Sequence, residues 1–403
     1  MIPADDILDA LDLSRAEPGS GFLDALFARF NAKVPFENAS KILRNALVSD
    51  PAAKPRTPEI FWEEHLESGT GGTCFARVAA FEALLGSLGF RSRKLLGKVQ
   101  REDDHAALMV ETAAGESIVD VGFPLPAILP ARPGRTATAQ GELEVAAIPR
   151  GFRIAFLEGV PETPREIEVY AEPVLVERFA DLWRETFRPE ARFLQEVILR
   201  RDLGNRVLSF GAGEVRVDDL HSRLHVPAPA PAGAALSELF GIDIGLLAKA
   251  FALVGESSTG ADRNARLTAY LETDAAPEQA FASIATREGY GRLLAGVADV
   301  AVGPETPGGY RLTLSAPSSD SSGPAIHEDV STDASERRVT IVRSHDGRES
   351  ASSYRVLKRG KKTYLTREAM LSGRRDDLLR NDSLRGRLAG SLAVDLLAWA
   401  RML

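Results

Sequence analysis

The run Gly71-Gly72-Thr73-Cys74-Phe75 decides how the N-terminal part of this 403-residue chain is interpreted. It contains the one cysteine of the sequence, so Cys74 is either a buried small apolar residue or a reactive thiol, because no disulfide can form within the chain. Downstream of it an apolar stripe recurs at helical spacing and ends at a glycine: Val78, Phe81, Leu85, Leu88 and then Gly89. The pattern predicts a helix that begins at Cys74.

A thiol in the first turn of a helix lies beside backbone N–H groups that have no partner within the helix. These groups and the helix dipole favour an anion, and Gly71 and Gly72 allow a tight turn just before the helix. The same N–H groups could hold the oxyanion of an acyl intermediate. The position therefore favours a nucleophilic role for Cys74, although an ordinary core residue is the commoner fate of a buried cysteine.

Two downstream segments predict a β-hairpin that carries a base and a carboxylate. His105 begins the alternating run Asp104–Thr112, and Asp120 lies inside the strand-like run Ser117–Phe123, with a turn at Ala113–Glu116 between them. Pairing of the two strands would bring the imidazole to the aspartate, which would fix its tautomer and stabilise its charged form. An aspartate in an apolar strand also needs a partner. We therefore predict that these two side chains serve the thiol as general base and orienting carboxylate.

These motifs resemble those of the arylamine N-acetyltransferase family. The segment Val34-Pro35-Phe36-Glu37-Asn38 matches its N-terminal signature, and the Cys74 run followed by Leu84–Phe90 resembles its nucleophile helix. Asp120-Val121-Gly122-Phe123 resembles its aspartate strand, and Phe240-Gly241-Ile242-Asp243 resembles the end of its third region.

Over residues 1–253 the resemblance implies a helical bundle, a β-barrel and an α/β lid. It also implies a catalytic triad of Cys74, His105 and Asp120 that takes an acyl group from an acyl-CoA co-substrate. The acyl group then passes to a small-molecule amine or related acceptor. Gly122 and Phe123 are the residues that the resemblance places beside the acyl-CoA.

One departure from the family pattern concerns the acidic residue of the N-terminal signature. The family usually has an arginine where Thr70 stands, so Glu37 loses an ion-pair partner. Arg77 and Lys41 are the cations that could replace it. If Glu37 stayed buried and unpaired, its carboxyl group would be harder to ionise.

Other departures leave the function open among three hypotheses. Ala76 and Val78 stand where the family usually has glutamate and asparagine, and Pro124 stands where it commonly has a glycine near the CoA phosphates. Proline has no N–H to offer a phosphate. The first hypothesis is an acyltransferase that uses a Cys74 thioester. The second is a hydrolytic or transglutaminase-like thiol enzyme with the same triad, and the third is a non-catalytic descendant that binds a ligand.

Composition indicates a globular cytoplasmic protein. The formal charge of −8 provides no basic surface for nucleic acid, and one cysteine suits a reducing compartment. The N-terminus is acidic, unlike a signal peptide, and no run of about 18 apolar residues predicts a membrane span. Histidines and cysteine do not fall at zinc-site spacing, so we predict no metal.

The length of the chain predicts a second domain. Residues 254–264 read as a small, polar linker, and residues 265–403 contain strand-like and helical segments of their own. We expect strands at Arg266–Thr273, Tyr310–Leu314, Arg338–Arg343, Ser352–Lys358 and Lys362–Thr366, a helix that opens near Pro277, and an amphipathic helix over Ser383–Leu403. This order resembles the START-like, or polyketide-cyclase-like, helix-grip fold, in which the last helix closes a curved sheet over a cavity that could bind an apolar ligand. The alternative is that the helix packs on a filled sheet and leaves no cavity. The fold class predicted for the whole chain is α+β and multidomain.

Overall fold

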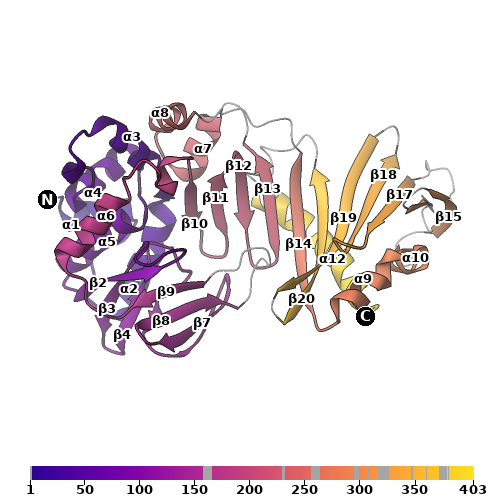
Figure 1. Ribbon diagram of the computed structural model, residues 1–403, viewed down its shortest axis with the longest axis horizontal. Helices are drawn as coiled ribbons and strands as arrows, with labels where there is room; N and C mark the ends of the chain where they lie inside the picture. The colour runs from indigo at the N-terminus through magenta and orange to yellow at the C-terminus, as the bar shows by residue number, and fades with distance from the viewer. Residues whose placement is uncertain are drawn as a thin grey trace. The chain divides into compact units, whose positions relative to one another are not determined.

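The computed structural model describes residues 2–157, 166–228, 232–255, 264–294, 299–306, 309–315, 326–345, 348–359, 361–371, 379 and 381–403. The chain has an α+β architecture and divides into two compact units (Figure 1). The first unit holds the described residues up to Leu220 and those of 228–255; the second holds His221–Pro227 and the described residues from 264 onward. The predicted linker falls almost entirely on residues 256–263, which lie outside the described residues. The domain assignments therefore stay predictions.

Helices make up a large part of the first unit. They are α1 (Ala4–Ala10), α2 (Ser20–Lys33), α3 (Ala39–Leu47), α4 (Pro58–Ser68), α5 (Cys74–Ser87), α6 (Val176–Glu185), α7 (Ala232–Phe240) and α8 (Ile244–Val254), with short 3-10 helices η1 (Pro51–Ala53) and η2 (Arg192–Leu194). The central element is α5, because it packs against α4 on one side and against strands on the other. Its predicted apolar stripe is buried, and Val78, Phe81 and Leu85 are fully enclosed. The structure therefore confirms the helix predicted to begin at Cys74.

An eight-stranded antiparallel sheet is also part of this unit. Its order is β5 (Leu129–Pro130), β4 (Gly115–Val119), β3 (His105–Thr112), β2 (Ser92–Lys98), β9 (Glu166–Tyr170), β8 (Gly151–Phe156), β7 (Gly141–Ile148) and β6 (Gly134–Thr138). The pleat of β3 divides the core: Leu108 and Val110 pack with α5, whereas Ala107 and Met109 pack among the other strands. Strand β3 thus supports the nucleophile helix with one face.

The hairpin of β3 and β4 corrects two predicted boundaries. Thr112 pairs with Gly115, so the turn is shorter than predicted and Gly115, with φ of +112°, already belongs to β4. The second strand ends at Val119, so Asp120 follows the strand and does not lie inside it. The chain turns there because the Asp120 side chain accepts a hydrogen bond from the backbone N–H of Phe123, which competes with continued strand pairing.

A further set of strands in the first unit connects the N-terminal signature with the later part of the unit. Strands β1 (Phe36–Glu37), β10 (Leu199–Asp202), β11 (Val207–Gly211) and β12 (Glu214–Asp218) pair antiparallel in this order. Phe36 pairs with Arg200 in the first of these contacts. Helices α7 and α8 pack against each other, and α8 also packs against α3.

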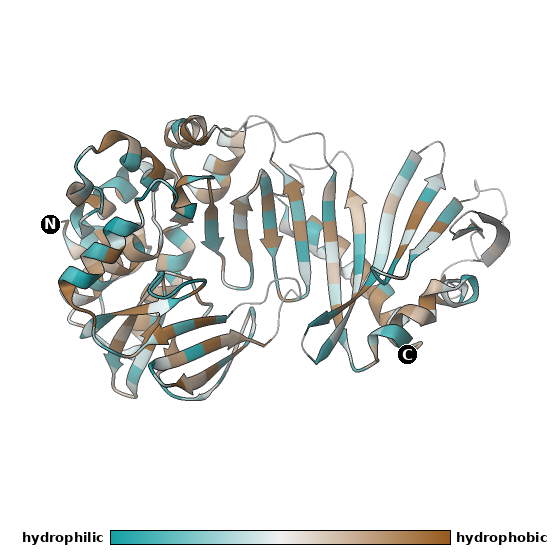
Figure 2. Cartoon of the chain, in the orientation of Figure 1, coloured by the Kyte–Doolittle hydropathy of each residue, from teal (hydrophilic) through white to brown (hydrophobic). Residues whose placement is uncertain are grey.

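The second unit is an antiparallel sheet with helices. Its strands are ordered β13 (Ser222–Pro227), β14 (Ala265–Thr273), β20 (Lys362–Leu371), β19 (Arg348–Arg359), β18 (Arg338–His345), β17 (Ile326–Asp333), β16 (Gly309–Ser315) and β15 (Asp299–Thr306). Helices α9 (Pro277–Ala285), α10 (Arg287–Leu294) and α12 (Asp382–Ala400) accompany the sheet. Bands of hydrophobic and hydrophilic residues alternate along the strands of both units (Figure 2), as expected for sheets with one face in a core.

Each of the five strands and both helices predicted for residues 265–403 is present. Helix α12 packs against β14 and β20, with Leu396 and Trp399 fully buried. The Trp399 ring meets the Tyr354 ring edge-on, and its indole N–H donates to the Ser283 hydroxyl at 2.8 Å. A long terminal helix therefore closes on the sheet, and the assignment to the START-like fold with an apolar ligand stays a prediction.

Two features bear on location and metal binding. Within the described ranges, no helix is both long and apolar enough to cross a membrane. The same residues contain no group of three or more His, Cys, Asp or Glu side chains arranged to hold a metal ion. The cytoplasmic location and the absence of metal and of nucleic-acid binding stay predictions.

Candidate active site

Cys74 is the first residue of α5, and the glycines before it let the signature strand approach closely. Gly72 forms a parallel bridge with Phe36, and a side chain on Gly71 would begin 1.7 Å from the Pro35 carbonyl oxygen. The thiol is 7% exposed, and its Sγ lies 3.9 Å from the backbone oxygen of Asp104, the residue before His105. The first-turn N–H groups of α5 lack intrahelical acceptors, which makes this end of the helix favourable for an anion.

His105 and Asp120 form a buried pair. The imidazole Nε2 lies 2.7 Å from Asp120 Oδ2, and the two side chains are 2% and 0% exposed. Asp120 Oδ1 accepts the Phe123 N–H at 2.7 Å, so both carboxylate oxygens have partners. On the other side the Asp104 carboxylate accepts three backbone N–H groups of the turn at 99–101, which fixes the chain where β3 begins. Asp120 therefore fixes the imidazole of His105, and Asp104 fixes the backbone from which it extends.

The environment of His105 favours its protonated form. Burial opposes a charge on the ring, but attraction to the Asp120 carboxylate, the hydrogen bond to it and the contact with Cys74 outweigh burial and raise the pKa of His105 to about 10. Because Asp120 occupies Nε2, the other ring nitrogen, Nδ1, is available to the thiol. An imidazolium with a carboxylate behind it and a thiol in front is suited to hold a thiolate.

Gly122 lets the turn after β4 touch both reactive side chains. A side chain on it would begin 2.3 Å from the Ala106 backbone oxygen, 2.9 Å from Cys74 Cβ and 3.1 Å from His105 Cε1. The Phe123 ring stands perpendicular to the imidazole, with 6.4 Å between ring centroids. Both residues that the resemblance assigns to the donor site therefore lie beside the candidate triad.

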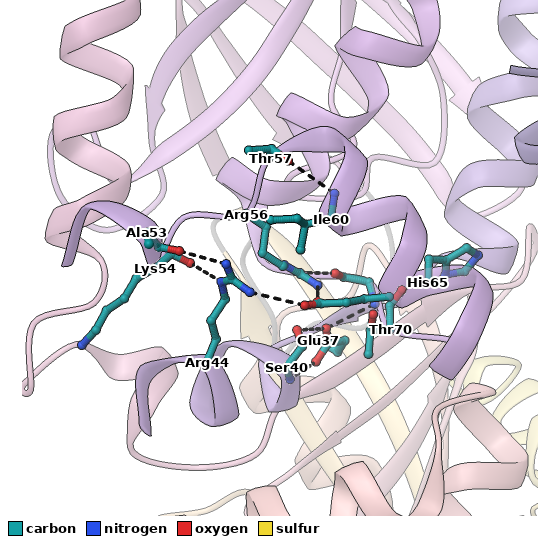
Figure 3. Close-up of polar contacts among 12 residues, drawn as sticks. Glu37, Ser40, Arg44, Ala53, Lys54, Arg56, Thr57, Ile60, His65 and Thr70 are labelled. Atoms are coloured by element: carbon teal, nitrogen blue, oxygen red, sulfur yellow. Dashed lines mark hydrogen bonds and ion pairs between the residues drawn. The ribbon is translucent and has the colours of Figure 1, made fainter. Parts of the chain in front are cut away.

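Glu37 finds hydrogen-bond donors in place of the cation expected for it (Figure 3). Its carboxylate accepts the Ser40 hydroxyl and, at 2.9 Å, the Ser40 N–H, and it also accepts the Gly71 N–H at 3.2 Å. Arg56 also holds the loop before Cys74, because its guanidinium donates to the Gly71 carbonyl and pairs with Glu64 at 2.7 Å. The loop before Cys74 is thus anchored although Thr70 stands where the family has arginine.

Arg77 holds α5 to its surroundings instead of pairing with Glu37. Its guanidinium is 0% exposed and donates to the carbonyls of Val34 and Val121 and to the Asn31 side chain. Burial lowers its pKa to about 9, and nearby charges of both signs, including Arg200 and Asp120, act on it as well. The bond to Val121 ties the nucleophile helix to the residue that follows Asp120.

The remaining departures from the family pattern are Ala76 and Val78 in α5 and Pro124 in the turn after β4. Ala76 and Val78 are buried in the core that contains α5. Pro124 receives a long hydrogen bond of 3.4 Å from the Arg200 guanidinium, which also lies over the Phe123 ring. The contact of His105 with Asp120 is present despite these departures. Pro124, however, offers no N–H to a ligand.

The sequence interpretation missed what two buried cations do. Arg77 and Lys41 were considered only as partners of Glu37, yet each has other neighbours. For Arg77 the available signal was a charged residue between apolar neighbours on the predicted helix, since such a residue needs a partner or a ligand.

Comparison with known proteins shows what the N-terminal part of the chain is similar to. Residues 21–151 match the family model described as N-acetyltransferase. The chain is 34% identical to the arylamine N-acetyltransferase of Escherichia coli K12 over 108 residues, which are 25% of this chain and 36% of that protein. It is 32% identical to that of Mycolicibacterium smegmatis over 120 residues, 27% of this chain and 42% of that protein. The matched region thus spans roughly two fifths or less of these relatives.

Solved structures extend the likeness to the fold of a longer region. The arylamine N-acetyltransferase of Salmonella typhimurium superimposes with a TM-score of 0.53 and 19% identity, over 62% of this chain and 98% of that one. A Mycobacterium marinum arylamine N-acetyltransferase in complex with CoA gives a TM-score of 0.53 and 17% identity, over 62% and 96%. The resemblance to the arylamine N-acetyltransferase family is confirmed for the N-terminal part of the chain.

Proposed function

We propose that this protein is a cysteine-dependent acyltransferase that carries an acyl group as a Cys74 thioester and passes it to an amine. The observation that carries the proposal is the 2.7 Å contact of His105 with the buried Asp120, in a ring whose other partner is the thiol at the start of α5. A thiol, a base and a carboxylate in this order are the elements of nucleophilic acyl transfer.

In the first half-reaction the Cys74 thiolate attacks the thioester carbonyl carbon of an acyl-CoA. A C–S bond forms, and first-turn N–H groups of α5 stabilise the oxyanion. When the tetrahedral intermediate collapses, the bond to the CoA sulfur breaks and His105 gives its proton to that sulfur. The products are acyl-Cys74, free CoA and a neutral imidazole.

In the second half-reaction the acceptor amine attacks the acyl-Cys74 carbonyl. Neutral His105 accepts the proton that the amine loses, and Asp120 stabilises the resulting imidazolium across the short contact. Collapse expels the Cys74 thiolate beside that imidazolium, which restores the starting pair. Atoms balance: the acyl group leaves sulfur and forms an amide, and one proton has passed from the amine to CoA.

We place the thioester end of the donor against Gly122 and Phe123. The absence of a side chain at Gly122 keeps space next to Cys74 and His105, and Phe123 supplies an apolar surface. Pro124 contributes no N–H to the phosphates, so phosphate contacts come from other residues. The nearby phenylalanine and glycine fit the small acyl end of the donor better than its charged end.

The hydrolytic and transglutaminase-like alternatives share the triad and differ in the acceptor. The match of residues 21–151 with the N-acetyltransferase family favours transfer to a small amine. A non-catalytic role fits the site less well. Ala76 and Val78 are buried in the core, and the His105–Asp120 contact is present beside them.

The test is the intact mass of the protein after incubation with acetyl-CoA, beside a Cys74→Ser variant. We expect one acetyl adduct that hydroxylamine removes, absent from the variant, and discharged by an added aromatic amine with formation of the amide. Discharge by water at the same rate with and without amine would support the hydrolase. No adduct from any acyl-CoA would contradict the proposal.

A further inference from the structure

Lys41 is an enclosed amine whose Nζ has no hydrogen-bond partner among the described residues. It lies in the first turn of α3, and the residue is only 5% exposed. The ring centres of Phe187 and Phe193 lie 4.8 Å and 5.9 Å from Nζ. Burial lowers the pKa of Lys41 to about 7, so much of the side chain is a neutral amine at pH 7 and above. A neutral amine out of contact with water is a nucleophile.

One carboxylate fixes the start of α3 to the loop before the thiol. Glu37 accepts the N–H and the hydroxyl of Ser40, which directly precedes Lys41. The same carboxylate accepts the Gly71 N–H at 3.2 Å, three residues before Cys74. Bonds to a single side chain therefore hold the turn that carries Lys41 against the loop that leads to the thiol.

Further contacts lead from the amine to the thiol. The Phe193 ring beside Nζ meets the Phe36 ring at 5.6 Å, and Phe36 is bridged to Gly72, two residues before Cys74. The charge of Cys74 acts to raise the pKa of Lys41, against the larger effect of burial, which requires the two groups to be near each other. An acyl group on the Cys74 sulfur would therefore lie close to an amine that can attack it.

We propose that Lys41 is an internal acyl acceptor: when no amine substrate is present, the acyl group moves from the Cys74 sulfur to Nζ of Lys41. This rests on the proposed Cys74 thioester. The neutral amine attacks the thioester carbonyl carbon, a C–N bond forms and the C–S bond breaks. His105, neutral after the first half-reaction, accepts the proton that the nitrogen loses. The products are an amide on Lys41 and the restored pair of thiolate and imidazolium, and no further reactant is needed.

The arrangement favours this transfer over a lysine that only packs against aromatic rings. Both groups belong to one chain, so the attack is unimolecular, and groups held close together react as if at a very high concentration. The phenylalanine rings around Nζ keep water, the competing nucleophile, away from the amine. Lys41 is thus a modification site that the protein acylates by itself.

The first experiment incubates the wild-type protein with acetyl-CoA and no amine, and follows intact mass and peptide maps over time. We expect an early acetyl group that hydroxylamine removes, then an acetyl group on Lys41 that hydroxylamine leaves in place. Lys249, exposed on α8, is the control within the same molecule, and Lys41 should be acetylated at least about a hundredfold faster. Equal rates at the two lysines, or a Cys74 adduct that stays fully removable, overturn the proposal.

The second experiment repeats the time course in two variants. Cys74→Ser should acetylate Lys41 no faster than Lys249, because the thioester is the source of the acyl group. Lys41→Arg keeps a cation between the rings but has no nucleophilic amine, so its Cys74 adduct should stay sensitive to hydroxylamine. Unchanged acetylation of Lys41 in Cys74→Ser, or an equal yield of resistant adduct in Lys41→Arg, overturns the proposal.

A third measurement separates the two proposals, because 4-nitrophenyl acetate acylates reactive thiols without CoA. If it loads Cys74 and the acetyl group then appears on Lys41, while acetyl-CoA gives no adduct, the acyl-CoA reaction is wrong and internal transfer stands. If either reagent loads Cys74 and no amide forms on Lys41, internal transfer is wrong and the acyltransferase is unaffected. If neither reagent loads Cys74, both proposals fail.

Discussion

Replacing Asp120 by asparagine removes one negative charge from behind His105 and keeps the size of the side chain. An asparagine carries one side-chain oxygen, so it can accept a hydrogen bond from either His105 Nε2 or the Phe123 N–H, and its NH2 group then faces the other position. The variant also loses the attraction that opposes the burial of the ring. Because burial by itself disfavours the imidazolium, His105 should be neutral near pH 7 in the variant.

The magnitude follows from the pKa of His105, which is about 10 in the protein and 6.5 ordinarily. A difference of between three and four units corresponds to roughly 4–5 kcal/mol of preference for the imidazolium. Loss of most of it would slow thiolate attack by about a thousandfold to ten-thousandfold. Removal of the aspartate charge from a serine-protease triad has an effect of about the same order.

The assay is the single-turnover rate of acetyl-Cys74 formation, followed by rapid quenching and intact mass. Asp181→Asn is a matched control, because Asp181 is exposed on α6 and pairs with Arg184 on the same helix. That control should acylate at the wild-type rate. If folded Asp120→Asn acylates within tenfold of wild type, the charge behind His105 is not needed and the assignment of Asp120 is wrong.

Three further outcomes are expected from the same contacts. Gly122→Ala places a side chain within 2.3 Å of a backbone oxygen, so it should destabilise the fold by about 1–3 kcal/mol and suppress acylation. The control Gly86→Ala meets open space on α5 and should be neutral or stabilising. Urea unfolding and intact mass compare the two variants. Arg77→Met leaves three acceptors unpaired and should lower the free energy of unfolding by roughly 2–4 kcal/mol. The control Arg91→Met, at an exposed position, should change it by less than about 0.5 kcal/mol. Equal effects of the two variants in thermal denaturation would contradict the anchoring role of Arg77. The pKa of His105 is raised on folding, so its contribution to stability is complete below about pH 6.5 and is lost as pH rises towards 10; urea unfolding at pH 7 and 9.5 should therefore show a decline that His105→Gln lacks.

Local patterns in the sequence were sufficient for the elements that carry the candidate site. The apolar stripe after Cys74 predicted α5 and its first residue, because helical spacing of large side chains specifies one buried face. Alternation after His105 predicted β3 for the corresponding reason in a strand. Five strands and the terminal helix of residues 265–403 followed from the same two periodicities, whereas β15, β17 and α10 were not predicted.

Boundaries and polar partners were decided by contacts that no local pattern contains. The hairpin turn is shorter than predicted, and Asp120 leaves the strand because its carboxylate binds both the Phe123 N–H and His105. Glu37 takes its donors from Ser40 and Gly71, the latter 34 residues away. Such bonds depend on where distant segments meet in space, and spacing along the chain does not report this.

The sequence by itself determined that a thiol, an imidazole and a carboxylate occur in an order and in local structures suited to acyl transfer, because helix and strand periodicity are local properties of the chain. Only the tertiary structure decided that His105 and Asp120 share a buried contact and that Arg77 bonds to two segments far from it in the sequence. It also left the Lys41 ammonium between two aromatic rings. The physical reason is that burial and charge pairing are properties of three-dimensional packing, which removes water from groups that lie far apart in the sequence.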